Sequence, residues 1–271
     1  MDWLVTILYG FFTGFGQLLP VSVSAHDYFL TQITRFDPEQ PLLLLWIHLA
    51  TFGALFLFYR RRAAHILRQI RIRDSRRPAD MGAVLDGQVV RSMLLPAILG
   101  LVFAGWLRRQ FGTLPSTVFW LILSGAAIYI PHFLPTGNRD SNHISRLEAM
   151  LFGLLSAVSA IPGLSRLGAI LSFGSLRGCS RTYLMDVVML MLLPLLLVQI
   201  LLDLIALMLS GLAALSLLYW LRCVLAGVAA FGGACLGIGC MRFLAVERGY
   251  TAFAYFNWGL GIFGFILYLM I

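Results

Sequence analysis

Two interrupted apolar segments decide the fold of this chain of 271 residues. Residues 10–26 read GFFTGFGQLLPVSVSAH, and residues 153–168 read GLLSAVSAIPGLSRLG. Each segment has a glycine-containing apolar run, then a proline, a short serine-containing turn and a second apolar run. Apolar pieces of about 10–14 residues are too short to cross a bilayer, and a break inside a membrane needs protein or a water-filled cavity around it. Each segment therefore predicts a broken, re-entrant helix hairpin.

The two broken segments lie at corresponding places in the two halves of the chain. Paired interrupted segments are typical of membrane folds built from internal repeats, with the binding site at the repeat interface. We therefore predict an all-α integral membrane protein, a polytopic helical bundle with two inverted repeats. The first repeat covers about residues 1–134 and the second about residues 145–271, within a single transmembrane domain.

The amino-acid composition agrees with a membrane protein. Residues of the AVILMFWYC set make up 60% of the chain and charged residues 12%, whereas soluble domains have roughly 45–50% and about 25%. These values exclude a soluble globular enzyme and a disordered chain. The four cysteines form no CxxC pair, so they indicate neither a metal site nor a redox site. The runs long enough to span a bilayer are residues 41–59, 115–134, 183–209, 212–240 and 252–271.

The positive charge is carried by arginine alone. All 20 basic residues are arginines, and the net charge is +8. Because they lie mostly between apolar runs, they favour a membrane surface rather than nucleic acid as partner. Eight of them fall within residues 60–77, so the positive-inside rule predicts a cytoplasmic, arginine-rich loop at about 60–80. The run at 41–59 leads into this loop, so the first broken segment should open to the outer side.

The second broken segment carries a candidate anion-binding group. Arg166 lies in an otherwise apolar half-helix, where a charge is costly and marks a functional site by default. A guanidinium suits phosphate, and free backbone N–H groups at the start of a helix, near Gly163 and Ser165, would add to an anion site. An alternative stays open, in which Arg166 pairs with Asp186 or with a backbone carbonyl.

The first broken segment carries candidate catalytic groups. His26 follows Ser22 and Ser24. A histidine can act as nucleophile, general acid or general base, and a serine can bind or attack a phosphate. His26, which stands beside Asp27, could equally be an interface residue. The other histidines are expected to be ordinary interface or loop residues: His48, His65, His132 and His143.

Three motifs resemble one known family. Residues 19–26, LPVSVSAH, resemble the LPVSSSGH signature of the undecaprenyl-diphosphatase family, and residues 162–168, PGLSRLG, resemble its PGxSRSG signature. Residues 178–194 are similar in spacing to the family's GxSRxxAxxFSFLLxxP stretch. Because order, spacing and chain length agree, the resemblance covers nearly the whole chain.

The resemblance implies an integral membrane phosphatase of the bacterial cytoplasmic membrane. Such enzymes hydrolyse C55 polyprenyl diphosphate to the monophosphate at the outer face and so recycle the lipid carrier for peptidoglycan synthesis. The resemblance implies Ca²⁺ or Mg²⁺ as cofactor and a polyprenyl (di)phosphate lipid as partner, and it leaves a homodimer open. The catalytic positions that match are His26, Ser22 and Arg166. The residues expected to bind the diphosphate are Arg166, Ser165, Gly163, Ser24 and Gln17, of which Arg166 and Ser165 match functional positions of the family.

The chain departs from the family pattern where acidic chemistry is expected. Ahead of LPVS, the family has an acidic or amide residue and a glutamate four residues later, and this chain has Thr13 and Gln17. Neither can accept a proton or bind a metal as a carboxylate does, so the metal ligands are unknown. Leu167 and Ala25 also replace a serine and a glycine of the signatures. Three functions stay open: the phosphatase, a catalytically degenerate relative that binds or translocates polyprenyl phosphate, and a transporter of another anion.

Overall fold

The computed structural model describes residues 2–34, 36–72, 80–210 and 216–270. Apart from one isolated β-bridge, regular structure in these residues is helical, which confirms the all-α prediction. The first half contains α1 (Asp2–Gly16), α2 (Val23–Thr34), α3 (Pro41–Ile72), α4 (Met81–Val102), α5 (Ala104–Phe111), α6 (Leu114–Tyr129) and the 3-10 turn η1 (Ile130–Phe133). The second half contains α7 (Arg146–Val158), α8 (Arg166–Leu176), α9 (Arg181–Ser210), α10 (Leu217–Met241), the π-helical η3 (Arg242–Arg248) and α11 (Thr251–Met270).

Helices of membrane-spanning length dominate the described ranges. Six of them are long and apolar enough to cross a bilayer: Pro41–Arg71, Met81–Val102, Leu114–Phe133, Arg181–Ser210, Leu217–Leu244 and Thr251–Met270. Large apolar side chains cover their outer surfaces, and Leu209, for example, is 83% exposed. A large exposed apolar surface of this kind marks contact with lipid or with another protein. The structure therefore confirms a polytopic helical membrane protein.

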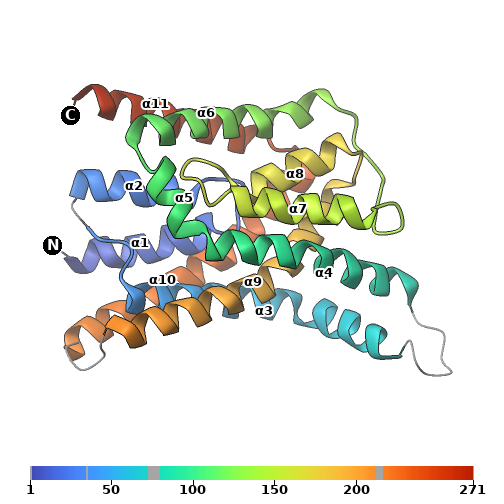
Figure 1. Ribbon diagram of the computed structural model, residues 1–271, viewed down its shortest axis with the longest axis horizontal. Helices are drawn as coiled ribbons and strands as arrows, with labels where there is room; N and C mark the ends of the chain where they lie inside the picture. Colours follow the sequence, from blue (N-terminus) through green and yellow to red (C-terminus); the bar gives the residue numbers. More distant parts are fainter. Residues whose placement is uncertain (1, 35, 73–79, 211–215, 271) are drawn as a thin grey trace.

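Both predicted helix breaks are present. α1 ends before Pro20 and α2 begins after it, and α7 ends before Pro162 and α8 begins after it. Proline has no N–H to donate and its ring clashes with the preceding turn, which disfavours a continuous helix at both places. Figure 1 shows the chain turning back at each break. Two short helix pairs thus replace two spanning helices.

The packing of the two halves supports an internal repeat. The helices α1, α2, α3, α4 and α6 can be matched in order with α7, α8, α9, α10 and α11. Among the α-helices of the described ranges, the short α5 then has no counterpart. With this matching, the contact of α1 with α10 corresponds to that of α7 with α4, and α3 with α10 corresponds to α9 with α4. The matched helices α3 and α9, and likewise α6 and α11, contact each other. A two-fold repeat produces this exchange of partners, while the inverted orientation and the repeat limits stay predictions.

Small residues bring the exchanged helix pairs close together. A Cβ atom at Gly14 of α1 would lie 2.2 Å from the carbonyl oxygen of Ala230 in α10. A Cβ atom at Gly153 of α7 would lie 2.2 Å from the carbonyl oxygen of Met93 in α4. Lipid is as apolar as a leucine side chain, so helices in a membrane associate through close packing of this kind rather than through the hydrophobic effect. These glycines therefore fix how the two halves meet.

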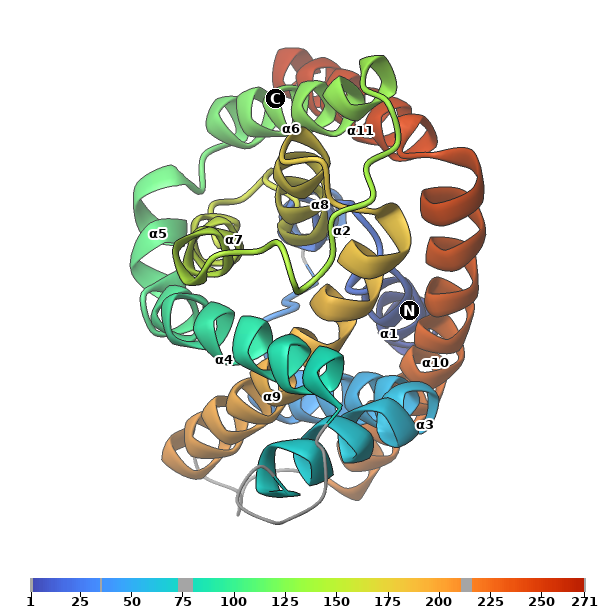
Figure 2. The ribbon, with the colours of Figure 1, turned by 90° about the vertical axis from the view of Figure 1, so that its right-hand side faces the viewer.

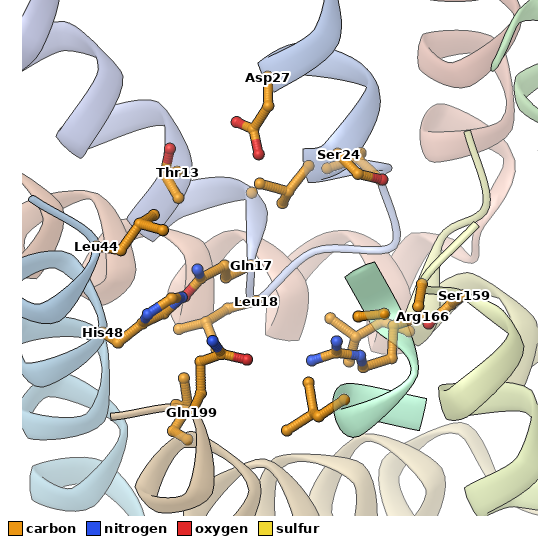
Figure 3. Close-up of a pocket in the computed structure, with 18 of the residues that line it drawn as sticks. Thr13, Gln17, Leu18, Ser24, Asp27, Leu44, His48, Ser159, Arg166 and Gln199 are labelled. Carbon is orange, nitrogen blue, oxygen red and sulfur yellow. The ribbon is translucent and has the colours of Figure 1, made fainter. Parts of the chain in front are cut away.

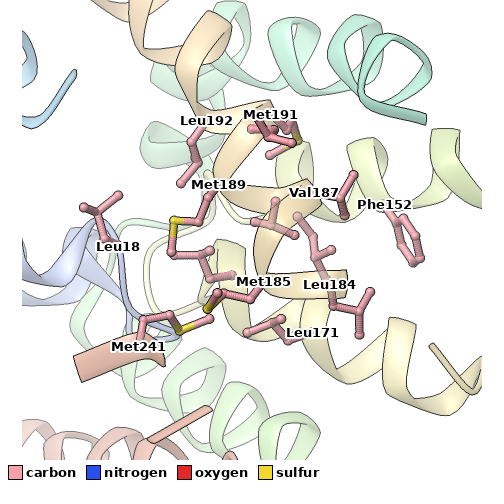
Figure 4. Packing of buried hydrophobic residues seen from close by; sticks show 14 of the residues in the cluster. Leu18, Phe152, Leu171, Leu184, Met185, Val187, Met189, Met191, Leu192 and Met241 are labelled. Carbon is pink, nitrogen blue, oxygen red and sulfur yellow. The ribbon is translucent and has the colours of Figure 1, made fainter. Parts of the chain in front are cut away.

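Helix α9 forms the centre of the bundle. Its residues 187–193 are all buried, so this stretch has no lipid-facing side, as expected for a helix that is apolar all round. Figure 4 shows Met185 and Met189 of α9 near Leu18 of the first break and Leu171 of α8. Figure 2 shows α9 passing between the other helices. Both broken segments are thereby packed against one central helix.

A polar cluster joins α3, α4 and α9 at the end of α3 that carries the arginines. Arg62 contacts Asp186, and its Nη2 lies 3.2 Å from Asp86 Oδ2. The Tyr59 hydroxyl donates to Asp186 over 3.2 Å. Asp186 is engaged here, so the alternative in which it pairs with Arg166 is wrong.

The arginine-rich loop expected at 60–80 is shorter in the structure. α3 continues as a helix to Ile72, because the arginine, alanine, leucine and glutamine residues in this stretch are good helix formers. Their long side chains can also lie along the helix while the charged ends reach water. Residues 73–79, with three of the eight arginines, lie outside the described residues.

Candidate active site

A cavity of about 170 Å³ lies between the two broken segments and helices α3, α5 and α9 (Figure 3). Leucines of α8 and α9 form much of its apolar wall. Exposed Glu39 and Arg108 pair with each other at its edge. Drug-sized pockets measure roughly 300–1,000 Å³, so this cavity suits a small headgroup rather than a long hydrocarbon chain. The other polar lining residues are Tyr9, Thr13, Gln17, Ser24, Asp27, His48, Ser159, Arg166 and Gln199.

Arg166 is the cation at the inner side of this cavity. It is the first residue of α8, and Figure 3 shows its side chain among the lining residues. Its Nε is buried without a hydrogen-bond partner, and it forms no ion pair with any residue in the described ranges. An unpaired buried charge is costly, and the positive end of the α8 dipole lies beside it. The site therefore favours an anionic ligand.

The backbone donors expected to cradle a phosphate are used inside the protein. The Gly163 N–H donates to Ser22 Oγ over 3.2 Å, and the Ser165 N–H donates to Ser124 Oγ over 3.1 Å. Ser165 Oγ accepts from the Gly168 N–H at 3.0 Å and so caps α8. Neither Gly163 nor Ser165 lines the cavity. In this structure both residues hold the break in place.

Ser22 and His26 lie beside the cavity rather than in its wall. Ser22 is 1% exposed and links the two breaks through Gly163. His26 Nδ1 lies 2.7 Å from the Ser22 carbonyl oxygen, and its ring stacks on Phe256 of α11 with a centroid distance of 5.6 Å. Ser24, in contrast, does line the cavity together with Arg166. Of the predicted site residues, the structure brings Gln17, Ser24 and Arg166 together.

The sequence offers Asp27, Glu148 and Asp186 as carboxylates that could stand in for the missing acidic residues, and of these Asp27 lines the cavity. Thr13 and Gln17 line the α1 side and are neutral, but Asp27 of α2 lines the same cavity. Asp27 Oδ1 and Gln17 Oε1 are buried and have no hydrogen-bond partner among the described residues. Asp27 lies three residues after Ser24 in α2, and this helical spacing places the two on one face of the helix.

Comparison with known proteins places the chain in a family. The family model described as "Bacitracin resistance protein BacA" matches residues 6–263. The chain belongs to the BacA family. The undecaprenyl-diphosphatase of Idiomarina loihiensis is 29% identical over 188 residues, which cover 67% of this chain and 68% of that protein. The undecaprenyl-diphosphatase 2 of Stutzerimonas stutzeri is 26% identical over 194 residues, with coverage of 67% and 68%. These matches confirm the resemblance.

This BacA family member has a further departure at Val23. The LPVSSSGH signature has serine where this chain has Val23, a difference that a letter-by-letter comparison shows. Val23 and Ser24 line the cavity, whereas Ser22 does not. The cavity of this BacA chain therefore has one hydroxyl fewer than the signature would place there.

His48 differs from the expectation of an ordinary interface residue. It lines the cavity and is 8% exposed, and its Nδ1 lies 2.5 Å from Asp203 Oδ2. The other Asp203 oxygen accepts a hydrogen bond from Gln199 over 3.1 Å. His48 and Asp203 are 155 residues apart in this BacA chain, so no local pattern connects them. The remaining histidines do not line the cavity: His65, His132 and His143.

Proposed function

We propose that this protein hydrolyses undecaprenyl diphosphate, or a related polyprenyl diphosphate, to the monophosphate and inorganic phosphate. One observation carries the proposal: Arg166 lines a cavity of headgroup size, its Nε is buried without a hydrogen-bond partner, and it forms no ion pair among the described residues. Relatives named undecaprenyl-diphosphatase support the same phosphoric anhydride hydrolysis. The activity would serve lipid-carrier recycling for the cell wall.

The polar lining residues have different roles in binding the diphosphate. Arg166 binds the terminal phosphate through two parallel hydrogen bonds and stabilises the charge that develops on its oxygens. The Ser24 hydroxyl and the Gln17 amide N–H groups donate to the remaining phosphate oxygens. These donors are held in place before the reaction and lose little free energy in reorganising. The polyprenyl chain stays in the lipid, because the cavity admits only the headgroup.

The position of the cavity supports a site open to the outer face. Pro38, Glu39 and Leu44, near the start of α3, line it. The arginines lie at the other end of this helix, which the positive-inside rule assigns to the cytoplasm. The diphosphate would enter from the outer leaflet of the bacterial cytoplasmic membrane.

One lining residue fits a divalent cation. BacA family members in general depend on such an ion. The described ranges contain no group of three or more His, Cys, Asp or Glu residues that could hold a metal by themselves. Asp27 Oδ1, however, is a buried oxygen without a partner, and Mg²⁺ commonly takes one carboxylate together with substrate phosphate oxygens. Asp27 would hold the ion, which when bound neutralises charge on the diphosphate.

The replacement Asp27→Asn tests this assignment. We expect it to raise the Mg²⁺ or Ca²⁺ concentration for half-maximal phosphate release about 10-fold or more, since an amide is a weaker ligand than a carboxylate. The measurement is a titration of the purified protein with each cation. Asp37→Asn, at an exposed carboxylate outside the cavity, is the control and should leave the midpoint unchanged. If the two variants need the same cation concentration for half-maximal phosphate release, Asp27 is not a ligand of the cation.

Phosphate release decides the proposed function itself. We expect the purified protein in detergent, supplied with Mg²⁺ or Ca²⁺, to release inorganic phosphate from undecaprenyl or farnesyl diphosphate above the level of Arg166→Ala. The alanine variant lacks the anion-binding group and defines the background. Lipid binding is measured in parallel. Lipid binding without phosphate release above this background would contradict the proposed phosphatase activity.

A second candidate function is a polyprenyl phosphate binder or transporter without hydrolysis. The neutral Thr13 and Gln17, and Val23 in place of the signature's serine, favour it. Arg166 alone is sufficient to hold a lipid phosphate in the same cavity. Binding without release in the experiment above is the result that selects this candidate.

A further inference from the structure

A buried histidine–aspartate pair lies on the side of the cavity that faces Arg166, where His48 lines the cavity and Asp203 is hydrogen-bonded to His48. His48 comes from α3 and Asp203 from α9, so two helices far apart in sequence supply the pair. Figure 3 shows His48 and Arg166 on opposite sides of the cavity, with Gln17 next to His48. A ligand whose phosphate contacts Arg166 would thus lie between the guanidinium and the imidazole.

The hydrogen bonds of the pair define which ring nitrogen remains free. Asp203 is 5% exposed, and both its oxygens are engaged, Oδ2 by His48 Nδ1 at 2.5 Å and Oδ1 by Gln199 at 3.1 Å. A carboxylate accepts, so the proton of the neutral imidazole is assigned to Nδ1, and Nε2 carries the free lone pair. His48 Nε2 has no hydrogen-bond partner among the described residues.

A carboxylate bound to Nδ1 is the arrangement that prepares an imidazole to accept a proton. It fixes the tautomer and the ring orientation, and it stabilises the imidazolium that forms. Asp203 is buried and held by two donors, so it can perform this role without water. Thr13 and Gln17, at the positions where the resemblance implies acidic chemistry, cannot accept a proton in this way.

We propose that His48 is the general base of the reaction and that Asp203 is its positioning residue. This inference rests on the proposed function. The oxygen of a water molecule forms a bond to the terminal phosphorus, and the water proton passes to His48 Nε2. The bond from that phosphorus to the bridging oxygen breaks, and its electron pair leaves with the polyprenyl monophosphate. The second product, inorganic phosphate, stays on Arg166 until release.

Two variants test the pair, one at each partner of the hydrogen bond between His48 and Asp203. His48→Gln removes the proton acceptor, and we expect kcat to fall about 10²–10⁴-fold while KM stays within about threefold. Asp203→Asn keeps the shape of the side chain but disturbs the tautomer, and a similar loss of kcat is expected. His132→Gln, an exposed histidine outside the cavity, is the matched control with unchanged kcat.

Two readouts separate a base from a merely structural residue. The acid limb of the kcat–pH profile should disappear in His48→Gln, and added imidazole should restore part of the rate of His48→Ala. The kcat–pH profile is compared between variants because Asp203 contacts His48 directly and other ionisable or charged groups line the same cavity: Tyr9, Asp27, Glu39, Arg108 and Arg166. Thermal unfolding in detergent shows whether each variant is folded.

The outcomes distinguish this inference from the function on which it rests. An active wild-type protein, with folded His48→Gln and Asp203→Asn variants whose kcat lies within threefold of it, would overturn the base and leave the phosphatase standing. Wild-type protein with no release above Arg166→Ala would overturn both. Loss of kcat in either folded variant, together with the changed pH profile or imidazole rescue, supports the pair.

Discussion

Replacing Arg166 by alanine should lower kcat/KM for polyprenyl diphosphate hydrolysis by about 10³-fold or more, since an arginine at a transferring phosphoryl group supplies effects of that size. Arg166 Nε is buried, so water screens the charge of the guanidinium less than it would at the surface. Phosphate release by the purified variant, measured against the wild-type protein, checks the expectation. Rates within about threefold of each other would contradict a phosphate-binding role.

A lysine at the same position separates charge from geometry. Arg166→Lys keeps the positive charge but loses the planar pair of donors, so we expect a loss of about 10–10²-fold, smaller than that of alanine. Neither change breaks an ion pair among the described residues, so the unfolding temperature should stay close to that of the wild-type protein. The control is Arg91→Ala, at an exposed arginine of α4 that lies outside the cavity.

The features of the fold that follow from local chemistry could be predicted from the sequence. Pro20 and Pro162 each lie between a glycine-containing apolar run and a serine-containing turn, and this combination predicts the two breaks. Proline alone does not, since Pro96 lies inside α4 and Pro194 inside α9. Five of the six spanning helices follow from long apolar runs, whereas α4 does not, because Asp86 and Arg91 interrupt its first half. The positive-inside rule predicts a loop from about residue 60, but arginine is a good helix former and α3 continues to Ile72.

The residues that line the cavity could be predicted only in part, because they depend on the orientation of each helix about its own axis. Ser22, Ser24 and His26 are close in sequence, yet only Ser24 lines the cavity. Ser22 instead accepts a backbone N–H from the other break. The contact of His48 with Asp203 depends on the packing of α3 against α9, which no motif in either segment encodes.

The site also depends on the backbone that presents Arg166. The second break is held by the hydrogen bonds of Gly163 to Ser22 and of Ser165 to Ser124. These bonds join α6 and the two broken segments, so the start of α8 is fixed relative to the residues across the cavity. The donors that the resemblance assigns to the substrate therefore act through Arg166, by holding it in place.

Gly163→Ala should destabilise the protein by about 2–6 kcal/mol, from roughly 1–3 kcal/mol of backbone strain and about 1–3 kcal/mol of overpacking. Gly163 has φ +102°, and an added Cβ would lie 2.5 Å from the Thr117 carbonyl oxygen and 2.9 Å from the Leu121 nitrogen. Both atoms belong to the backbone of α6 and cannot rotate away. A loss of this size is a large part of a typical stability of about 5–15 kcal/mol.

The measurement is the thermal unfolding midpoint in detergent, with Gly232→Ala as the matched control. A Cβ at Gly232 meets nothing within 4 Å, and alanine is the better helix former, so this variant should unfold at the wild-type temperature or above it. Equal midpoints for the two variants would mean that the second break can relax around a side chain. A selective loss at Gly163 would show that the second break, from which α8 and Arg166 follow, requires glycine at this turn, because any other residue there meets both the strain and the contact with α6.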